Sequence, residues 1–102
     1  MDKKEAVTLA QQYASLVAKE MNPEKIILYG SHANGTATDK SDIDVAVIFD
    51  NFNGDWLSAY TRLTKLRRSI SLYIEPVLLD SAKDRSGFIR EVVKTGEVIY
   101  PQ

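Results

Sequence analysis

Residues 27–50 read ILYGSHANGTATDKSDIDVAVIFD, and the predicted arrangement of the strands follows from them. An apolar run ends at Gly30, a small polar loop follows, and a second apolar run opens with Asp42 and Asp44. Short apolar runs bounded by turn residues are typical of buried strands. Only about a dozen residues separate the two runs, which is the lower limit for a parallel crossover, so we expect an antiparallel return.

Outside this stretch the chain alternates between helical and strand patterns. Apolar residues at steps of three and four predict helices, and short apolar runs predict strands. The predicted elements are a helix over 7–17 stopped by Asn22-Pro23, a helix from Trp56 to Ile70, a strand over 72–79 (LYIEPVLL), a helix that buries Phe88, Ile89, Val92 and Val93 and ends at Gly96, and a short edge strand over 97–100 (EVIY).

Two capping signals precede the predicted helices in the second half of the chain. Asp55 is in position to cap the helix that begins at Trp56. Ser81, with Asp84 three residues later, forms a weak capping box that is expected to open the last helix. Three aromatic residues of this half are interpreted as core: Trp56, Tyr60 and Tyr73.

Alternating helices and strands predict an α+β, α/β-like fold, in which a small mixed β-sheet is flanked by helices. A full helix separates the second and third strands, which permits a parallel pair. The end of the first strand and the starts of the other two then meet at one rim. We expect this rim to bring together Gly30, Ser31, Asp42, Asp44 and Glu75.

The composition bounds the class of protein. With 102 residues, 44% of them hydrophobic, we expect a single domain over 1–102. A formal net charge of -1 supplies no positive field, so no direct nucleic-acid binding is expected, and the absence of cysteine excludes disulfides and thiolate metal sites. The first residues, MDKKEAVTLAQQYASL, contain no signal-peptide core and no membrane span, so we expect a cytoplasmic protein.

The paired aspartates indicate a metal site. Strand side chains alternate, so Asp42 and Asp44 point to the same face, about 7 Å apart along the chain. Such carboxylates repel one another unless a cation lies between them, and oxygen-only ligands suit magnesium. A third carboxylate on the neighbouring strand, Glu75, would allow two metal ions, the arrangement used for in-line displacement at phosphorus. Beside them, Gly30 permits a close backbone approach to a ligand, and the turn that Ser31 opens offers amides to phosphate.

The segment GSHANGTATDKSDID resembles the signature of the DNA polymerase beta nucleotidyltransferase superfamily, a Gly-Ser pair followed by ten residues and Asp-x-Asp. The chain is similar to the MNT group, the minimal nucleotidyltransferases, from the first helix to EVIYP. The resemblance implies the nucleotidyltransferase (DNA polymerase beta-like) fold. The roles it implies are nucleotide binding by Gly30, Ser31 and Ser41, binding of two magnesium ions by Asp42, Asp44 and Glu75, and help from Glu75 in deprotonating the attacking hydroxyl.

The resemblance also implies substrates and a partner. The donor would be ATP. Many stand-alone domains of this group act as antitoxins beside a HEPN-domain ribonuclease toxin, which is silenced when AMP is attached to one of its tyrosines. A hetero-oligomer with such a toxin is therefore expected.

The sequence departs from the family pattern at two places. The third carboxylate is more often aspartate, whereas here it is Glu75, followed by Pro76, which can donate no ladder hydrogen bond. His32 and Asn34 stand where many relatives carry arginine, and His32 is interpreted as a loop or phosphate-side residue. The bases that could compensate are Lys40, Arg62, Lys65, Arg67 and Arg68.

Two other functions remain open at this point. The chain could be a catalytically weak antitoxin that neutralises its partner by covering it, which would be favoured if Glu75 does not reach the metals. It could also transfer a nucleotide to a small molecule, although relatives with that activity bring a second domain to hold the acceptor.

Overall fold

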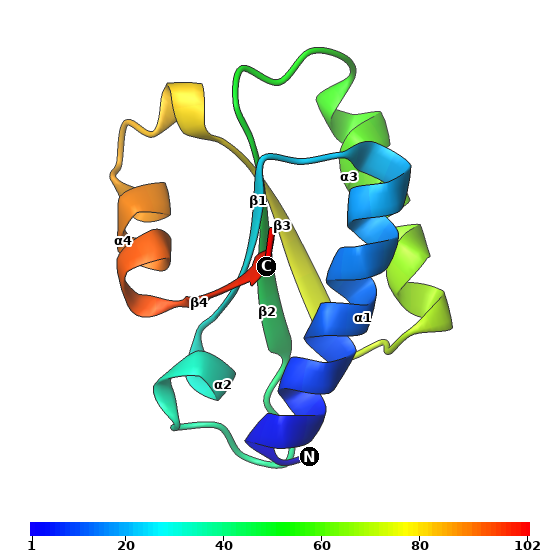
Figure 1. Ribbon diagram of the computed structural model, residues 1–102, viewed down its shortest axis with the longest axis vertical. Coiled ribbons are helices and arrows are strands. Elements are labelled where there is room, and N and C mark those ends of the chain that lie inside the picture. The colour runs from blue at the N-terminus through cyan, green and yellow to red at the C-terminus, as the bar shows by residue number, and fades with distance from the viewer.

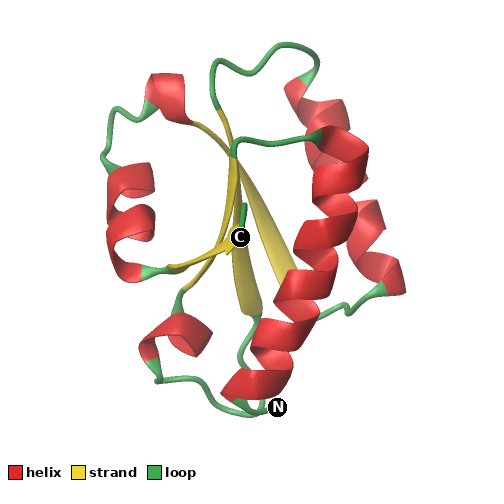
Figure 2. Ribbon diagram, viewed as in Figure 1, coloured by secondary structure: helices red, strands yellow, loops and turns green.

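The computed structural model describes residues 1–102 and contains a four-stranded sheet with helices on both faces (Figures 1 and 2). The α+β expectation is therefore confirmed. The elements in chain order are α1 (Lys3–Met21), β1 (Lys25–Tyr29), α2 (Ser31–Asn34), β2 (Ile43–Phe49), α3 (Trp56–Leu66), the 3-10 turn η1 (Arg67–Ser69), β3 (Ile74–Asp80), the 3-10 turn η2 (Ser81–Lys83), α4 (Phe88–Thr95) and β4 (Glu97–Tyr100).

The sheet has the strand order β3-β2-β1-β4. β1 pairs antiparallel with β2, and β2 pairs parallel with β3, as the connection lengths predicted. β4 adds to the free side of β1 as an antiparallel edge strand, which confirms the interpretation of EVIY. The end of β1 and the starts of β2 and β3 consequently lie at one end of the sheet.

The first helix is fixed by signals at both ends and by one apolar stripe. Asp2 precedes it and accepts a hydrogen bond of 2.8 Å from the Glu5 N–H, and Asn22 ends it in the left-handed conformation. Its buried residues are Ala6, Ala10, Tyr13, Ala14 and Val17. The Tyr13 hydroxyl donates to the Leu63 carbonyl at 2.7 Å and so ties α1 to α3.

The two faces of the sheet carry different helices. Alternate β2 residues, Ile43, Val45 and Val47, pack with α1 and α3, whereas Ala46 and Ile48 pack with residues of α4. On the second face, α4 lies beside the half of the sheet where β2 ends, and α2 lies beside the half where β2 begins (Figure 1). Phe88, the first residue of α4, still reaches Tyr29 at the end of β1, where the ring centroids lie 5.9 Å apart.

The interpretation of three aromatic residues as core was wrong. Trp56, Tyr60 and Tyr73 are 44%, 37% and 49% exposed, and Leu63 is the buried residue of α3. For Trp56 and Tyr60 the cause is that α3 lies over the side of the sheet that carries the edge strand β3, so one narrow stripe of the helix faces the sheet. Tyr73 lies just before β3 and outside the strand. Trp56 instead packs edge-on against Phe52, with ring centroids 5.3 Å apart.

The capping predictions need correction as well. Asp55 stands at the N-cap of α3, but its side chain accepts from the Ser58 hydroxyl and makes no capping bond to the backbone. Ser81 does not open the last helix, because residues 81–83 form η2 and α4 begins at Phe88. Asp84 caps α4 from a distance by accepting the N–H groups of two residues, Ile89 at 3.0 Å and Arg90 at 3.2 Å.

The last helix buries fewer residues than its pattern predicted. Ile89 and Val92 pack against the sheet, but Phe88 and Val93 are 41% and 39% exposed. The helix has eight residues, about two turns, so only one stripe of it reaches the sheet. No helix of the protein has both the length and the apolar character needed to cross a membrane.

Candidate active site

Three carboxylates lie on one face of the sheet, as predicted. Asp42 directly precedes β2, Asp44 is the second residue of β2, and the intervening Ile43 is fully buried on the opposite face. Glu75 is the Cα partner of Asp44 in the parallel ladder between β2 and β3. Paired residues of neighbouring strands point to the same side of a sheet, so all three side chains share one face.

The charges of these carboxylates are close enough to affect one another. The pKa of Asp44 is raised above its ordinary value by partial burial first, then by the negative charges of Asp42 and Glu75, while His32 opposes the shift. Such a cluster favours either a proton or a bound cation. Because the donor atoms are all carboxylate oxygens, magnesium is the cation whose preferences they match.

Gly30 lies against the central carboxylate. Its backbone has φ 76° and ψ −152°, a conformation that residues other than glycine rarely adopt. A Cβ at this position would collide with the Asp44 carboxyl oxygen. The sequence indicated a close approach to a ligand here, and the structure adds a second reason for glycine, the approach to Asp44.

The loop after Gly30 forms the short helical turn that was expected. Ala33 and Asn34 donate their N–H groups to the Gly30 carbonyl at 3.1 and 3.0 Å, and Thr36 donates to the Ser31 carbonyl at 3.1 Å. Ser31 is therefore the first residue of α2, directly beside the residue that contacts Asp44.

Ser41 closes the other end of the loop. Its hydroxyl accepts the Thr38 N–H at 2.8 Å, and its own N–H donates to the Thr38 carbonyl at 3.1 Å. These bonds form a tight turn that leads directly into Asp42. Ser41 thus lies in the same loop as Gly30 and Ser31, where a role in nucleotide binding remains a prediction.

Two basic residues contact the main chain at the site. His32, 1% exposed, lies 3.3 Å through Nε2 from the Ser41 carbonyl oxygen. Arg67 donates through Nη1 to the Ile74 carbonyl at 2.8 Å, and the same nitrogen lies 3.4 Å from a carboxyl oxygen of Glu75. The sequence placed Arg67 among several helix bases but gave no signal that η1 would turn it alone toward β3.

Tyr29 is a site residue that sequence reasoning missed. It is the Cα partner of Asp44 on the antiparallel side, opposite to Glu75, and its ring meets Phe88 edge-on at 5.9 Å. Its pKa is raised by burial first and then by Asp44 and Glu75, so its hydroxyl stays protonated. The signal that could have found it is strand alternation, since it directly precedes Gly30 in an antiparallel pair.

Pro76 does not interrupt the ladder next to Glu75. The Ile43 N–H donates to the Tyr73 carbonyl at 2.8 Å, so in a parallel ladder the alternate residues Ile74 and Pro76 direct their main-chain groups outward. Arg67 reaches the Ile74 carbonyl from that outer side. The missing N–H of Pro76 therefore falls on the free edge of β3, where proline is tolerated.

Two features of these residues suit a magnesium ion. The donor set is right for magnesium, and the absence of a Cβ at Gly30 lets the Asp44 carboxyl group lie against the Gly-Ser turn. No group of three or more His, Cys, Asp or Glu side chains is arranged to hold one ion as the structure stands. Glu75 is 51% exposed and its one ion pair is with Arg67, so a rotation of its side chain toward Asp44 would be needed to complete such a group.

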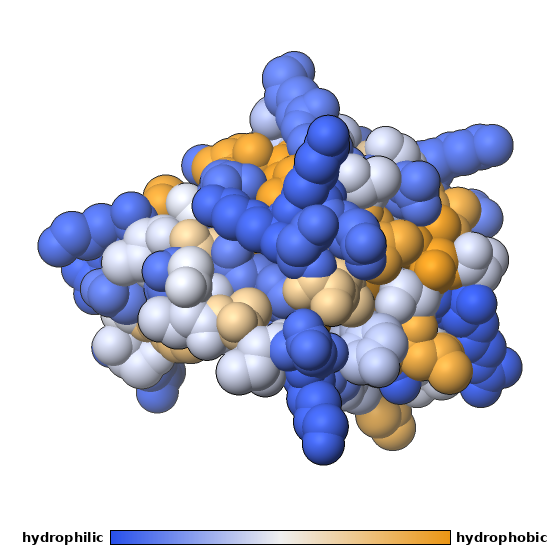
Figure 3. Space-filling model, turned by 90° about the horizontal axis from the view of Figure 1, so that it is seen from below, coloured by the Kyte–Doolittle hydropathy of each residue, from blue (hydrophilic) through white to orange (hydrophobic).

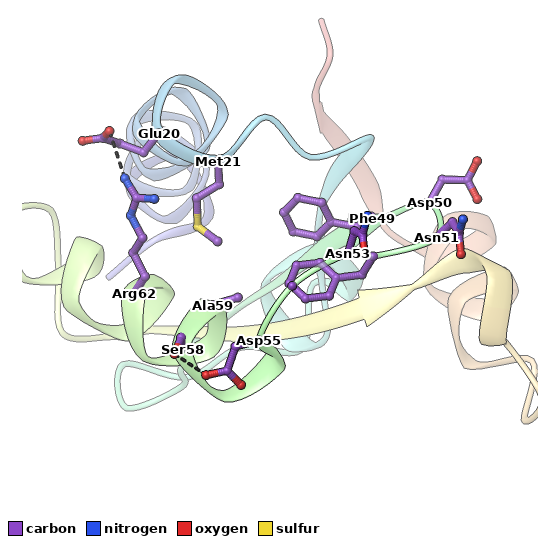
Figure 4. A pocket seen from close by; sticks show the side chains of 12 residues that line it. Glu20, Met21, Phe49, Asp50, Asn51, Asn53, Asp55, Ser58, Ala59 and Arg62 are labelled. Atoms are coloured by element: carbon purple, nitrogen blue, oxygen red, sulfur yellow. Dashed lines mark hydrogen bonds and ion pairs between the residues drawn. The ribbon is translucent and has the colours of Figure 1, made fainter.

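The carboxylates lie on an open face and not in an enclosed cavity. The largest cavity, about 450 Å³, lies at the other end of β2, where Phe49, Phe52, Met21 and the Glu20–Arg62 ion pair line it (Figure 4). None of the molecule's cavities is lined by Asp42, Asp44 or Glu75. Seen from the end where β2 begins, the surface is mostly polar with scattered apolar patches (Figure 3). Asp42 and Glu75 are exposed and Asp44 is half-buried, so the carboxylates can be reached from solvent.

The chain is similar to known proteins in sequence and in fold. Residues 11–102 match the family described as "Polymerase beta, Nucleotidyltransferase". A protein of Methanocaldococcus jannaschii named "Putative protein adenylyltransferase" is 35% identical over 78 residues, which are 76% of this chain and 78% of that protein. A solved structure titled as a "putative nucleotidyltransferase from Sulfolobus solfataricus" shares the fold with a TM-score of 0.69 at 22% identity, over 94% of this chain and 80% of that one.

Proposed function

The chain belongs to the polymerase beta nucleotidyltransferase family, and on that premise we propose that it transfers AMP from ATP to a tyrosine hydroxyl of a HEPN-domain toxin, with magnesium, and so acts as an antitoxin. One observation carries the catalytic part of this proposal. Asp44 is packed against Gly30 of the Gly-Ser turn and paired with Glu75 on the next strand. The phosphate-side loop and the carboxylates are thereby parts of one site.

Each part of the site has a task in this proposal. Gly30 and Ser31, with Ser41 at the other end of the loop, hold the phosphates of ATP. Asp42, Asp44 and Glu75 would hold two magnesium ions, which would neutralise charge on the phosphates and lower the pKa of the attacking hydroxyl. The proposed magnesium ligands are the same three carboxylates that share one face of the sheet.

The reaction is a displacement at the α-phosphorus. The tyrosine oxygen forms a bond to the α-phosphorus, the bond from that phosphorus to the bridging oxygen breaks, and pyrophosphate leaves with the bond's electrons. Glu75, 51% exposed at the open face, accepts the phenolic proton as general base. Tyr29 remains protonated beside Asp44 and can donate a hydrogen bond to the substrate.

A protein acceptor is supported by two observations. The carboxylate face is open, and no cavity around it would enclose a small acceptor. A 35% identical relative carries the name of a protein adenylyltransferase. The choice of a HEPN toxin comes from the resemblance to the MNT group.

Binding without catalysis is the second candidate. The observation that favours it is the contact of 3.4 Å between Arg67 and Glu75, together with the absence of a ready three-carboxylate cluster. In that case the chain would neutralise its partner by covering it, and the carboxylates would be dispensable.

One experiment separates the two candidates. The purified chain is incubated with ATP, magnesium and the protein encoded next to it, and AMP on a tyrosine is sought by mass spectrometry alongside ribonuclease activity. We expect AMP addition and silencing with the wild type and neither with the Asp42→Asn, Asp44→Asn double variant. Equal silencing by both, without added mass, would leave binding as the function.

A further inference from the structure

Two buried side-chain nitrogens in the molecule lack a hydrogen-bond partner, and both belong to residues at the site. They are Nδ1 of His32 and Nε of Arg67. Buried polar atoms are nearly always paired, so an unpaired one calls for an explanation. In both residues one nitrogen is buried without a partner, at a cost in free energy, while another nitrogen contacts a main-chain carbonyl.

Another nitrogen of each residue contacts a main-chain carbonyl group. His32 reaches the carbonyl of Ser41, the residue before Asp42, through Nε2 at 3.3 Å. Arg67 donates to the carbonyl of Ile74, the residue before Glu75, through Nη1 at 2.8 Å. Each of the two outer carboxylates thus follows a peptide group that is held by a basic side chain from another element.

The places of these contacts explain why they are needed. Asp42 precedes the first residue of β2, and Glu75 follows the first residue of β3, where strands end and pairing is weakest. Asp42 lies two residues before Asp44, and Glu75 is paired with Asp44 across the ladder, so like charges lie close together there. Without a restraint the main chain at either strand start would relax away from the central charge.

We propose that His32 and Arg67 are a pair of positioning residues, which hold the main chain before Asp42 and Glu75 so that both carboxylates stay beside Asp44. This inference rests on the proposed function, because the carboxylates need fixed spacing only if they bind metal together. Neither residue touches the substrate in this role. In metal sites, partners that orient the ligands contribute about 10- to 100-fold in metal affinity.

The test compares substitutions that keep or remove the donor. His32→Gln keeps an N–H near Nε2, whereas His32→Leu keeps the volume alone. Arg67→Lys keeps a donor that Arg67→Met lacks. Manganese affinity is measured by calorimetry on each protein without ATP or acceptor, with circular dichroism to monitor folding. Arg68→Met is the matched control, because Arg68 is exposed and has no ion pair.

We expect His32→Leu and Arg67→Met to weaken manganese binding by about tenfold or more and to lower kcat, with KM for ATP little changed. His32→Gln and Arg67→Lys should retain most of the affinity, and Arg68→Met all of it. Wild-type manganese affinity in both His32→Leu and Arg67→Met would overturn the positioning role. It would also be overturned if His32→Gln lost as much affinity as His32→Leu and Arg67→Lys lost as much as Arg67→Met.

Two other results would also decide the question. If His32→Leu does not fold, the decision passes to Arg67→Met against Arg67→Lys, since that side chain is 26% exposed and its loss is tolerable. If the wild type itself binds no manganese, the proposed function fails and the positioning role fails with it. Metal binding by the wild type with no effect of the substitutions removes the positioning role alone.

Discussion

Asp44 and Glu75 are paired residues of the parallel ladder between β2 and β3. The pairing places two carboxylates side by side on one face, with Asp42 two residues earlier on the same face. Negative charges in such proximity are unfavourable without a counter-ion. This single relationship connects the strand topology to the proposed chemistry, and it gives the first two predictions.

Asp44→Asn should abolish nucleotidyl transfer while the chain stays folded. The carboxylate is the central one of three, so its loss removes a ligand that the proposed metal site cannot replace. We expect turnover to fall by at least about a hundredfold in an assay of AMP incorporation. Wild-type chain in excess chelator is the control, and activity that survives there would contradict the metal requirement.

The same substitution should stabilise the metal-free protein at neutral pH. The pKa of Asp44 is raised in the folded state above its ordinary 3.8, so its contribution to stability is present below that value and is lost as pH rises through the raised pKa. An asparagine side chain resembles the protonated form at every pH. We expect the Asp44→Asn variant to melt a few degrees higher than wild type at pH 7, with the gap closing below about pH 4. Thermal melts in chelator across this pH range measure the gap, and a variant that melts lower at pH 7 would contradict the expected relief of repulsion.

The topology could be predicted from the sequence because connection length and alternation determine it. A loop of about a dozen residues forced the antiparallel return of β2, and a full helix permitted the parallel β3, so the meeting of Gly30, Asp44 and Glu75 followed. Tyr29 was missed because the apolar run to which it belongs reads as core, and only the pairing with Asp44 shows that it faces the site.

The predictions that were wrong or missing all concern features set by tertiary contacts, which a local sequence pattern does not contain. The apolar pattern of α3 indicates that one side of the helix is apolar, but not how wide a surface the sheet offers to it. Trp56 and Tyr60 were therefore interpreted as buried, although both are exposed. Likewise, local spacing suggested a capping box at Ser81, whereas Asp84 caps α4 after a turn that local pattern does not encode. Contacts of long side chains with distant carbonyls, such as Arg67 with Ile74, leave no sequence pattern.

Glu75→Gln tests the third carboxylate separately from the other two. If Glu75 completes the metal set and accepts the proton, ATP affinity should stay near wild type while turnover falls by about a hundredfold or more. ATP binding is measured by calorimetry and turnover by pyrophosphate release. Unchanged turnover would leave a two-carboxylate site, and Glu75→Asp, with a side chain one methylene shorter, reports whether reach matters.

Asp80→Asn should destabilise the fold without touching the chemistry. The Asp80 carboxylate is buried and accepts the N–H groups of Asn51, Phe52 and Ala82, each at 2.9 Å. Burial alone would raise its pKa, but these bonds lower it below the ordinary value. Its contribution is therefore present above about pH 4 and is lost as pH falls through the lowered pKa.

The amide of an asparagine at position 80 would turn an N–H donor toward one of those backbone donors, so we expect a lower melting temperature at pH 7 and a smaller difference in acid. Thermal melts at several pH values measure this. Asp50→Asn is the control, because Asp50 is exposed and its only side-chain bond is a contact of 3.3 Å from the Ser81 hydroxyl. A similar loss in both variants would show that the buried bonds of Asp80 do not matter.

Gly30→Ala and Gly35→Ala separate backbone strain from the contact with Asp44. Both glycines have positive φ, 76° and 78°, so alanine costs stability at each, on the order of 1–3 kcal/mol. A Cβ at Gly35 meets nothing within 4 Å, whereas one at Gly30 strikes the Asp44 carboxylate. We therefore expect both variants to melt lower, but only Gly30→Ala to lose transfer activity when assayed well below its melting temperature. Full activity in folded Gly30→Ala would show that Asp44 tolerates displacement, and the close packing of the turn against the carboxylate would then have no part in catalysis.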